Sequence, residues 1–228
     1  MRKPRADGQV TRSNLLLAAG RIFAEKGFRD ATIADICQSA KANQAAANYH
    51  FGSKETLYVE SWRFSFERSL RKYPPDGGVP PGAPVEERLR GRILALMQRI
   101  VDPQSHEMDI IYKELANPTG LLTHVLAQAL DPIFKGFRSI VTELLGPESS
   151  ERWVRLCLMS IRAQCFGPLM YERRRKMKSP PPGPGHDLGT EDVQTLADHV
   201  TRFSLAGILA VHRHVGHRDE NVETQQVL

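Results

Sequence analysis

Apolar residues recur at a spacing of three or four along almost the whole chain, and this spacing most constrains the fold. Residues three and four apart share one face of an α-helix, whereas the faces of a strand repeat every second residue. No segment shows a convincing period-two alternation. The sequence therefore predicts an all-α protein. The helices that we expect, about nine of them, cover residues 12–26, 33–40, 44–50, 54–72, 85–102, 106–116, 118–145, 148–177 and 191–214.

Two segments rich in proline and glycine interrupt the helical pattern. Residues 73–84 read YPPDGGVPPGAP, and residues 179–185 read SPPPGPG. Neither can hold a helix, because proline lacks the backbone N–H and clashes with the preceding turn. We therefore expect five parts: a flexible basic arm (1–11), a helical domain (12–58, from which helix 54–72 leads to the body), a flexible Pro/Gly linker (73–84), a helical body (85–215) and a flexible tail (216–228).

The positive charge of the chain is concentrated in its first third. Residues 1–72 hold 13 Lys and Arg against 7 Asp and Glu, whereas the remainder holds 18 against 19. This placement favours a polyanionic partner for the first third, although such asymmetry is common and not specific. No run approaches the roughly 18 apolar residues of a membrane helix, and no apolar stretch follows the basic start as in a signal peptide. We therefore expect a cytoplasmic, nucleoid-associated protein without a membrane segment.

The sequence lacks the motifs of common enzyme classes. It contains no P-loop, no HExxH pair, no nucleophile elbow and no paired catalytic carboxylates, so we expect neither an enzyme nor a cofactor. His212, His214 and His217 have no cluster of Cys or carboxylates nearby, so we expect no metal site. Cys157 and Cys165 fall on one predicted helix about 12 Å apart, too far for a disulfide. We expect the cysteines to be small buried hydrophobes.

Residues 33–51, IADICQSAKANQAAANYHF, predict two short helices joined by a turn at Lys41. Small residues between such helices permit the close approach of a helix-turn-helix. Thr32, Asn43 and Ser53 are good N-caps for the second, third and fourth helices. From this pattern alone, a helical hairpin with a solvated polar face is the alternative.

The outer face of the third helix carries neutral hydrogen-bonding groups. Gln44 and Asn48 can pair with adenine in the major groove, and Ala45 is small enough to approach a thymine methyl. Tyr49 and His50 lie where DNA phosphates would, and so does Lys54 at the start of the next helix, where the helix N-terminus also favours an anion.

Residues 11–58 resemble the DNA-binding domain of the TetR family of bacterial regulators. The matching stretches are LLLAAGRIFAEKGFRDATIADICQSA and NYHFGSKETLY. The resemblance implies a three-helix DNA-binding domain on an all-helical body. The family often has Gly where this chain has Lys41, which predicts a left-handed residue or a differently opened turn and suggests a phosphate role for Lys41. The expected DNA contacts are Thr32, Lys41, Asn43, Gln44, Ala45, Asn48, Tyr49, His50 and Lys54.

The C-terminal stretches YKELANPTGLL and SIRAQCFGPLMYERR resemble a subgroup known as CerR-like. Such a body would both dimerise and bind an effector. Long apolar stripes with small residues on the last two helices favour a homodimer interface. This interface is expected at Trp153, Cys157, Ser160, Gln164, Leu196, Val200, Ser204, Gly207, Ile208 and Val211. Apolar and aromatic residues near Pro132 and Pro168 favour a ligand pocket. The same residues are also typical of an ordinary hydrophobic core. The expected walls of the pocket are Leu94, Met97, Ile111, Tyr112, Leu130, Phe134, Phe137, Gln164, Phe166 and Met170.

Together these patterns predict a sequence-specific DNA-binding regulator, and specifically a repressor that a small apolar ligand releases from a palindromic operator on double-stranded DNA. The alternative is a DNA-binding adaptor whose helical body binds a protein partner in place of a ligand. A closed cavity in the body would distinguish the first hypothesis from the second.

Overall fold

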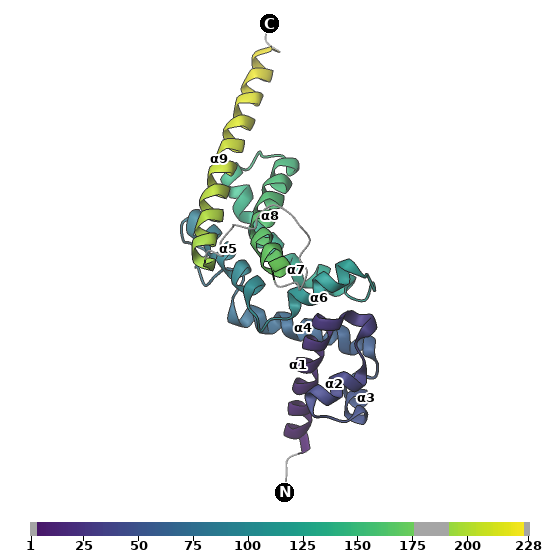
Figure 1. Ribbon diagram of the computed structural model, residues 1–228. Helices are drawn as coiled ribbons and strands as arrows, with labels where there is room; N and C mark the ends of the chain where they lie inside the picture. The colour runs from purple at the N-terminus through teal and green to yellow at the C-terminus, as the bar shows by residue number, and fades with distance from the viewer. Residues whose placement is uncertain (1–3, 176–191, 226–228) are drawn as a thin grey trace. The chain divides into compact units, whose positions relative to one another are not determined.

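The computed structural model describes residues 4–175 and 192–225, and every regular element in this part of the chain is an α-helix (Figure 1). The all-α prediction is therefore confirmed. The helices are α1 (Pro4–Asp30), α2 (Ile33–Ala40), α3 (Gln44–Phe51), α4 (Lys54–Lys72), α5 (Val85–Val101), α6 (Glu107–Ala116), α7 (Thr123–Leu145), α8 (Glu151–Arg175) and α9 (Val193–Gln225).

Several helix ends differ from the sequence-based expectation. Helix α1 begins at Pro4, so residues 4–11 are helical where we expected a flexible arm; proline is well suited to a first helical position. Helix α9 continues to Gln225, into the segment expected to be a tail. Helix α7 begins at Thr123 and not at residue 118. The Pro/Gly-rich segment 179–185 lies outside the described residues.

The first compact unit consists of the residues up to Lys72 together with Asp102–Leu130. In its core, the ring of Phe23 meets the ring of Tyr58 edge-on, with centroids 4.8 Å apart, and Trp62 stacks on Phe66. Helix α6 packs against α1 and α4 in this unit. The helix-turn-helix is therefore built into a larger unit than the 12–58 domain that we expected from the sequence.

The second compact unit consists of Tyr73–Val101 and the chain from Asp131 onward. Helix α5 packs against α8 and α9. Residues 73–84 form successive turns that lie against α5, and a Cβ at Gly77 would stand only 2.6 Å from the carbonyl carbon of Gly91. Two glycines without side chains allow this close contact, and the flexibility expected of this linker stays a prediction.

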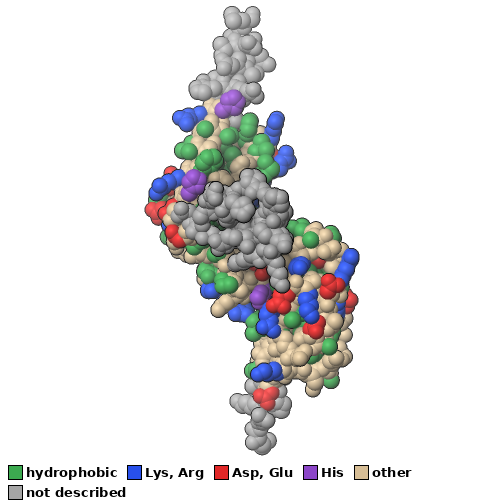
Figure 2. Space-filling view, in the orientation of Figure 1, with side chains coloured by type: hydrophobic (Ala, Val, Ile, Leu, Met, Phe, Trp, Pro, Cys, Tyr) green, Lys and Arg blue, Asp and Glu red, His purple; other side chains and the backbone are tan. Residues whose placement is uncertain are grey.

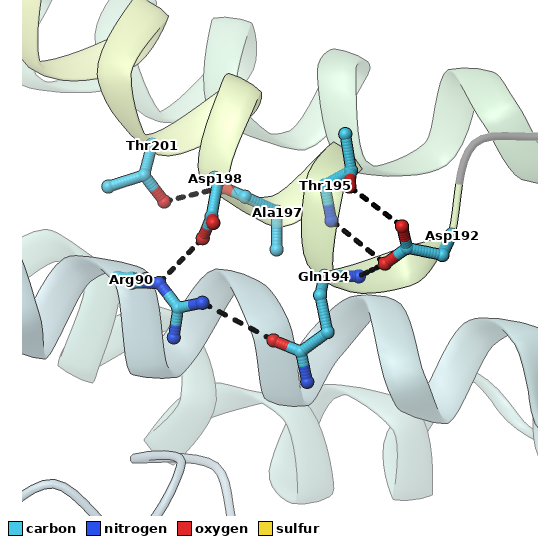
Figure 3. A network of polar contacts seen from close by, with 7 residues as sticks. All are labelled: Arg90, Asp192, Gln194, Thr195, Ala197, Asp198 and Thr201. Carbon is cyan, nitrogen blue, oxygen red and sulfur yellow. Dashed lines mark hydrogen bonds and ion pairs between the residues drawn. The ribbon is translucent and has the colours of Figure 1, made fainter.

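A polar network holds the beginning of α9 on α5 (Figure 3). Arg90 donates through Nε to Asp198 over 2.6 Å and through Nη2 to Gln194 over 3.3 Å. Asp192 accepts from the backbone N–H groups of Gln194 and Thr195, so it caps the helix. These hydrogen bonds, with that of the Thr195 hydroxyl first, lower the pKa of the Asp192 carboxyl. The network thus fixes where α9 starts.

Two features of the described residues bear on other functions. None of the helices there combines the length and the apolar character that crossing a bilayer requires. No group of three or more His, Cys, Asp or Glu side chains in the same part of the chain could hold a metal ion. The side chain of His217 lies outside the described residues. All three cysteines are buried and free, as the sequence predicted, and burial raises the pKa of the Cys165 thiol to about 12.

Candidate nucleic-acid interface

Helices α2 and α3 form a helix-turn-helix whose two N-caps are made by local side chains. The hydroxyl of Thr32 accepts from the N–H of Asp35 over 3.1 Å, and Oδ1 of Asn43 accepts from the N–H of Ala46 over 2.7 Å. Asp35 in turn accepts from Nζ of Lys26 over 2.7 Å. That hydrogen bond, followed by the one from Thr32, lowers the pKa of the Asp35 carboxyl. Both predicted caps are therefore confirmed.

The turn between α2 and α3 depends on a residue in the left-handed region. Lys41 has φ 52° and ψ 41°, and it is the one residue other than glycine with a positive φ in the described chain. The N–H of Lys41 donates to the carbonyl of Gln38, and that of Ala42 donates to the carbonyl of Cys37, which is the Schellman pattern. Of the two alternatives expected at Lys41, a left-handed residue or a differently opened turn, the structure has the first, and the Lys41 side chain is exposed.

One face of α3 is buried and the opposite face is free. Ala47 and Phe51 are buried against the rest of the unit. The exposed face displays three of the expected base contacts and the expected phosphate contact Tyr49, of which 86% is exposed. The exposed residues of this face are Gln44, Ala45, Asn48 and Tyr49. The fold therefore brings together on one helix the side chains that the sequence assigned to DNA, next to the half-buried His50.

Lys54 is placed differently from a free surface cation. Its Nζ donates to the carbonyl oxygen of Arg29 over 3.2 Å and lies 4.6 Å from the ring centroid of Phe28. Ser53 caps the same helix end, because its hydroxyl accepts from the N–H of Thr56. Lys54 therefore anchors the beginning of α4 to the end of α1, and a phosphate role would come in addition to this contact.

Glu114 in α6 is a buried residue that no pattern in the sequence singled out. Its carboxylate accepts from the hydroxyl of Tyr58 over 3.0 Å and from the N–H groups of Thr119 and Gly120 over 2.9 and 3.0 Å. Burial, and then the Glu114 carboxylate, raise the pKa of Tyr58 well above its usual range. A single Glu in an amphipathic helix gave no signal in the sequence, because such residues usually face solvent.

In the second unit, α8 and α9 enclose an open apolar groove of about 170 Å³. Figure 2 shows hydrophobic side chains gathered over this region beside α9. The groove contains most of the residues expected at the dimer interface; Leu196 is half-buried and Val200 buried, both outside the lining. The lining residues are Trp153, Leu156, Cys157, Ser160, Ile161, Gln164, Phe203, Ser204, Gly207, Ile208 and Val211.

The expected walls of the effector pocket divide between the two units. Ile111, Tyr112 and Leu130 belong to the first unit, whereas the α5 and α8 residues, together with Phe134 and Phe137 of α7, belong to the second. The side chain of Met170 lies outside the described residues. The described groove is a different place from these walls and shares only Gln164 with them. The walls that remain together in one unit are Leu94, Met97, Phe134, Phe137, Gln164 and Phe166.

Two known sequence families match the chain. The family described as bacterial regulatory proteins, tetR family, matches residues 15–60. The family described as the C-terminal domain of the HTH-type transcriptional dual regulator CecR matches residues 85–208. The two matches confirm the resemblance stated from the sequence, in which the C-terminal group carried the name CerR-like.

Individual relatives are similar over part of their length. The HTH-type transcriptional regulator SrpR of Pseudomonas putida is 27% identical over 133 residues, which are 57% of this chain and 59% of SrpR. The HTH-type transcriptional repressor KstR2 of Mycobacterium tuberculosis is 32% identical over 120 residues, which are 49% of this chain and 55% of KstR2. The chain thus spans somewhat more than half the length of these relatives.

Solved structures share the fold. A TetR-like transcriptional regulator from Rhodococcus sp. RHA1 matches with a TM-score of 0.65 at 16% identity, over 91% of this chain and 98% of that one. The TetR family transcriptional regulator PfmR from Thermus thermophilus matches with a TM-score of 0.59 at 18% identity, over 84% of this chain and 97% of that one. At these identities the likeness shows the fold alone.

Proposed function

The chain belongs to the TetR family of bacterial transcriptional regulators, which bind DNA, and from this premise we propose that it is a homodimeric repressor that a small ligand releases from a palindromic operator. The observation that carries the proposal is the exposed hydrogen-bonding face of α3, held in place by buried Ala47 and Phe51.

Two groups of side chains make different contacts with DNA. Gln44, Ala45 and Asn48 contact base edges and specify the sequence, since amides pair with adenine and alanine meets a thymine methyl. Tyr49, His50 and Lys41 contact phosphates and set the position of α3. The same surface is supported by the cap and anchor contacts of Thr32, Asn43 and Lys54 described above. Donor groups of these residues that remain unused in those contacts would hydrogen-bond to the DNA backbone.

The α8–α9 groove supports a two-fold dimer. It is apolar and open, and 62% of Phe203 on its rim is exposed. A second copy of the chain can cover the same surface in a self-complementary interface. Such a dimer would carry its two recognition helices about one DNA turn apart, roughly 34–36 Å, or somewhat farther when free.

Release by an effector requires the body to influence the DNA-binding domain. The ligand is proposed to bind at the apolar walls of the second unit that α5, α7 and α8 provide, and to shift an existing balance between spacings of the two recognition helices. In the first unit, the Tyr58–Glu114 contact ties α4 to α6, which supports coupling through packed helices. A tenfold loss of operator affinity needs a preference of only about 1.4 kcal/mol for the non-binding spacing.

The experiment is selection of bound sites from random double-stranded DNA by the purified protein. A recovered palindrome would support a dimer that reads two half-sites, and candidate ligands can then be tested for release. Enrichment of a single, non-repeated half-site would count against the dimer. Enrichment of no sequence would count against specific recognition by α3.

A further inference from the structure

Arg92 in α5 is a half-buried cation without a carboxylate partner. Its Nη1 donates one long hydrogen bond of 3.5 Å to the carbonyl oxygen of Pro75. Within the described residues, no carboxylate oxygen lies within 4.0 Å of its guanidinium. A guanidinium has five N–H donors in a planar fork, so most of its capacity to bind an anion is unused.

The neighbouring arginines of α5 show that Arg92 is an exception. Arg88 pairs with Glu143 over 2.6 Å, and Arg90 pairs with Asp198 over 2.6 Å. The Asp76 carboxylate acts on the Arg92 guanidinium through its charge, but it accepts a hydrogen bond from the N–H of Gly78 over 2.9 Å. Asp76 therefore belongs to its own turn and does not form an ion pair with Arg92.

Helix α7 leaves room for the Arg92 guanidinium. A Cβ at Gly136 would stand 2.6 Å from Cζ and 2.9 Å from Nη2 of Arg92. Glycine inside a helix costs about 0.5–1 kcal/mol relative to alanine. The gap at Gly136 therefore lets a charged group lie against α7 at the expense of helix stability.

The charges around Arg92 favour an added anion. Burial lowers the pKa of Arg92, the Asp76 carboxylate opposes this shift, and the Arg88 guanidinium adds to it. Arg88 and Arg92 are four residues apart and so lie on one face of α5, where like charges repel. A bound anion would offset both the repulsion and the loss of hydration.

We infer that Arg92, in the gap at Gly136, binds the carboxylate of a small amphipathic effector. A carboxylate fits the planar fork with two parallel hydrogen bonds. The apolar remainder would lie near Ile133 and Ile140, which stand three residues before and four after Gly136 on the same face of α7 and are both buried. The inference rests on the proposed function and specifies its small ligand as an amphipathic anion, in place of the apolar ligand expected from the sequence.

The experiment measures binding of three probes to the full chain by calorimetry: decanoate, the neutral decanamide, and inorganic phosphate. Decanoate is expected to bind at least tenfold more tightly than decanamide. Arg92→Gln is expected to weaken decanoate at least tenfold and leave decanamide unchanged. Gly136→Ala, which keeps the charge but displaces the guanidinium, is expected to weaken decanoate similarly. Arg138→Gln, which removes an exposed arginine paired with Glu151, is the matched control and is expected to change binding less than twofold.

Several results would overturn the inference. Equal affinity of the wild type for decanoate and decanamide, absence of binding by decanoate, or tighter binding of phosphate than of decanoate would each do so. If Arg92 serves only to hold Pro75, Arg92→Gln would lower the urea midpoint without changing the ratio of the two affinities. Arg92→Lys, which retains the charge, replaces Arg92→Gln if that variant does not fold. Operator binding without any probe is measured separately, so its failure would contradict the proposed function and not this site.

Discussion

The hydroxyl of Tyr58 in α4 donates to the buried carboxylate of Glu114 in α6 over 3.0 Å. The same carboxylate accepts from the backbone at Thr119 and Gly120. The Glu114 side chain therefore accepts hydrogen bonds both from the loop before α7 and from α4, the helix that follows the recognition helix. Packing and hydrogen bonding at this point join α6 to the DNA-binding domain.

Glu114→Ala is expected to destabilise the protein by about 2–4 kcal/mol, because it leaves several buried donors without an acceptor. The free energy of unfolding in urea measures this. Glu67→Ala, at an exposed position of α4, is the control and is expected to cost less than about 0.5 kcal/mol. Equal stability of the two variants would contradict the role assigned to Glu114.

The Tyr58 contact also predicts a pH dependence. The pKa of Tyr58 is raised in the folded protein, so folding favours the protonated phenol. The associated stability is present below the unfolded pKa of about 10 and is lost as the pH rises above it. The difference in free energy of unfolding between the wild type and Tyr58→Phe should therefore change in alkaline solution, with the wild type losing more. Parallel curves from about pH 8 to about pH 11, the range that brackets the ordinary phenol pKa, would show that Tyr58 does not contribute in this way.

Lys41→Gly is expected to separate backbone strain from charge. A residue with a side chain pays about 1 kcal/mol in the left-handed region, but glycine also gains freedom in the unfolded chain, by about the same amount. Stability should thus change by less than about 1 kcal/mol. The salt dependence of operator binding should fall by about 0.9 in slope if Lys41 contacts one phosphate. Lys41→Asn, neutral and tolerant of the same conformation, should give the same slope; an unchanged slope in both would exclude the contact.

Asn48→Ala and Tyr49→Phe are expected to have different effects on operator binding. The first should alter which operators are preferred, by about 1–3 kcal/mol at one base pair, and the second should weaken all operators alike. A panel of single-base operator variants measures both. Lys54→Ala is less informative, because it also removes the contacts to Arg29 and Phe28. If both substitutions weakened all sites equally, the division between base and phosphate contacts would be wrong.

Gly207→Leu tests the dimer surface without disturbing the protomer. A Cβ at Gly207 would meet no atom within 4 Å, and the residue lines the α8–α9 groove. A leucine there should clash only with a second copy and shift sedimentation toward the monomer. Gly167→Leu is the control, because a Cβ at Gly167 is equally free and lies outside the groove. A Gly207→Leu protein that stays dimeric would place the interface elsewhere.

Local chemistry explains which parts of this fold the sequence predicts. The starts of α2 and α3 follow from Thr32 and Asn43, whose caps act within three residues. The start of α7 does not follow from neighbouring residues. Glu114 accepts hydrogen bonds from the N–H groups of Thr119 and Gly120, and these bonds hold residues 117–122 outside the helix. These hydrogen bonds depend on burial against Tyr58, which lies 56 residues away.

The same limit applies to the rest of the chain. Proline and glycine in residues 73–84 predict the absence of helix but not the contact of Gly77 with Gly91. The exposed residues of α3 could be predicted as a site because one short helix carries them. Arg92 could not be predicted as a site, because its lack of a carboxylate partner depends on which acidic residues of other elements lie near it.

The most direct test of the central claim is the affinity of the protein for its selected palindrome when the spacing of the half-sites changes. A dimer with recognition helices about one turn apart should lose roughly a hundredfold or more in affinity when about five base pairs are inserted between the half-sites, since these then face opposite sides of the duplex. The original site should bind two protomers. Affinity that does not depend on the spacing, or one protomer per site, would contradict the account.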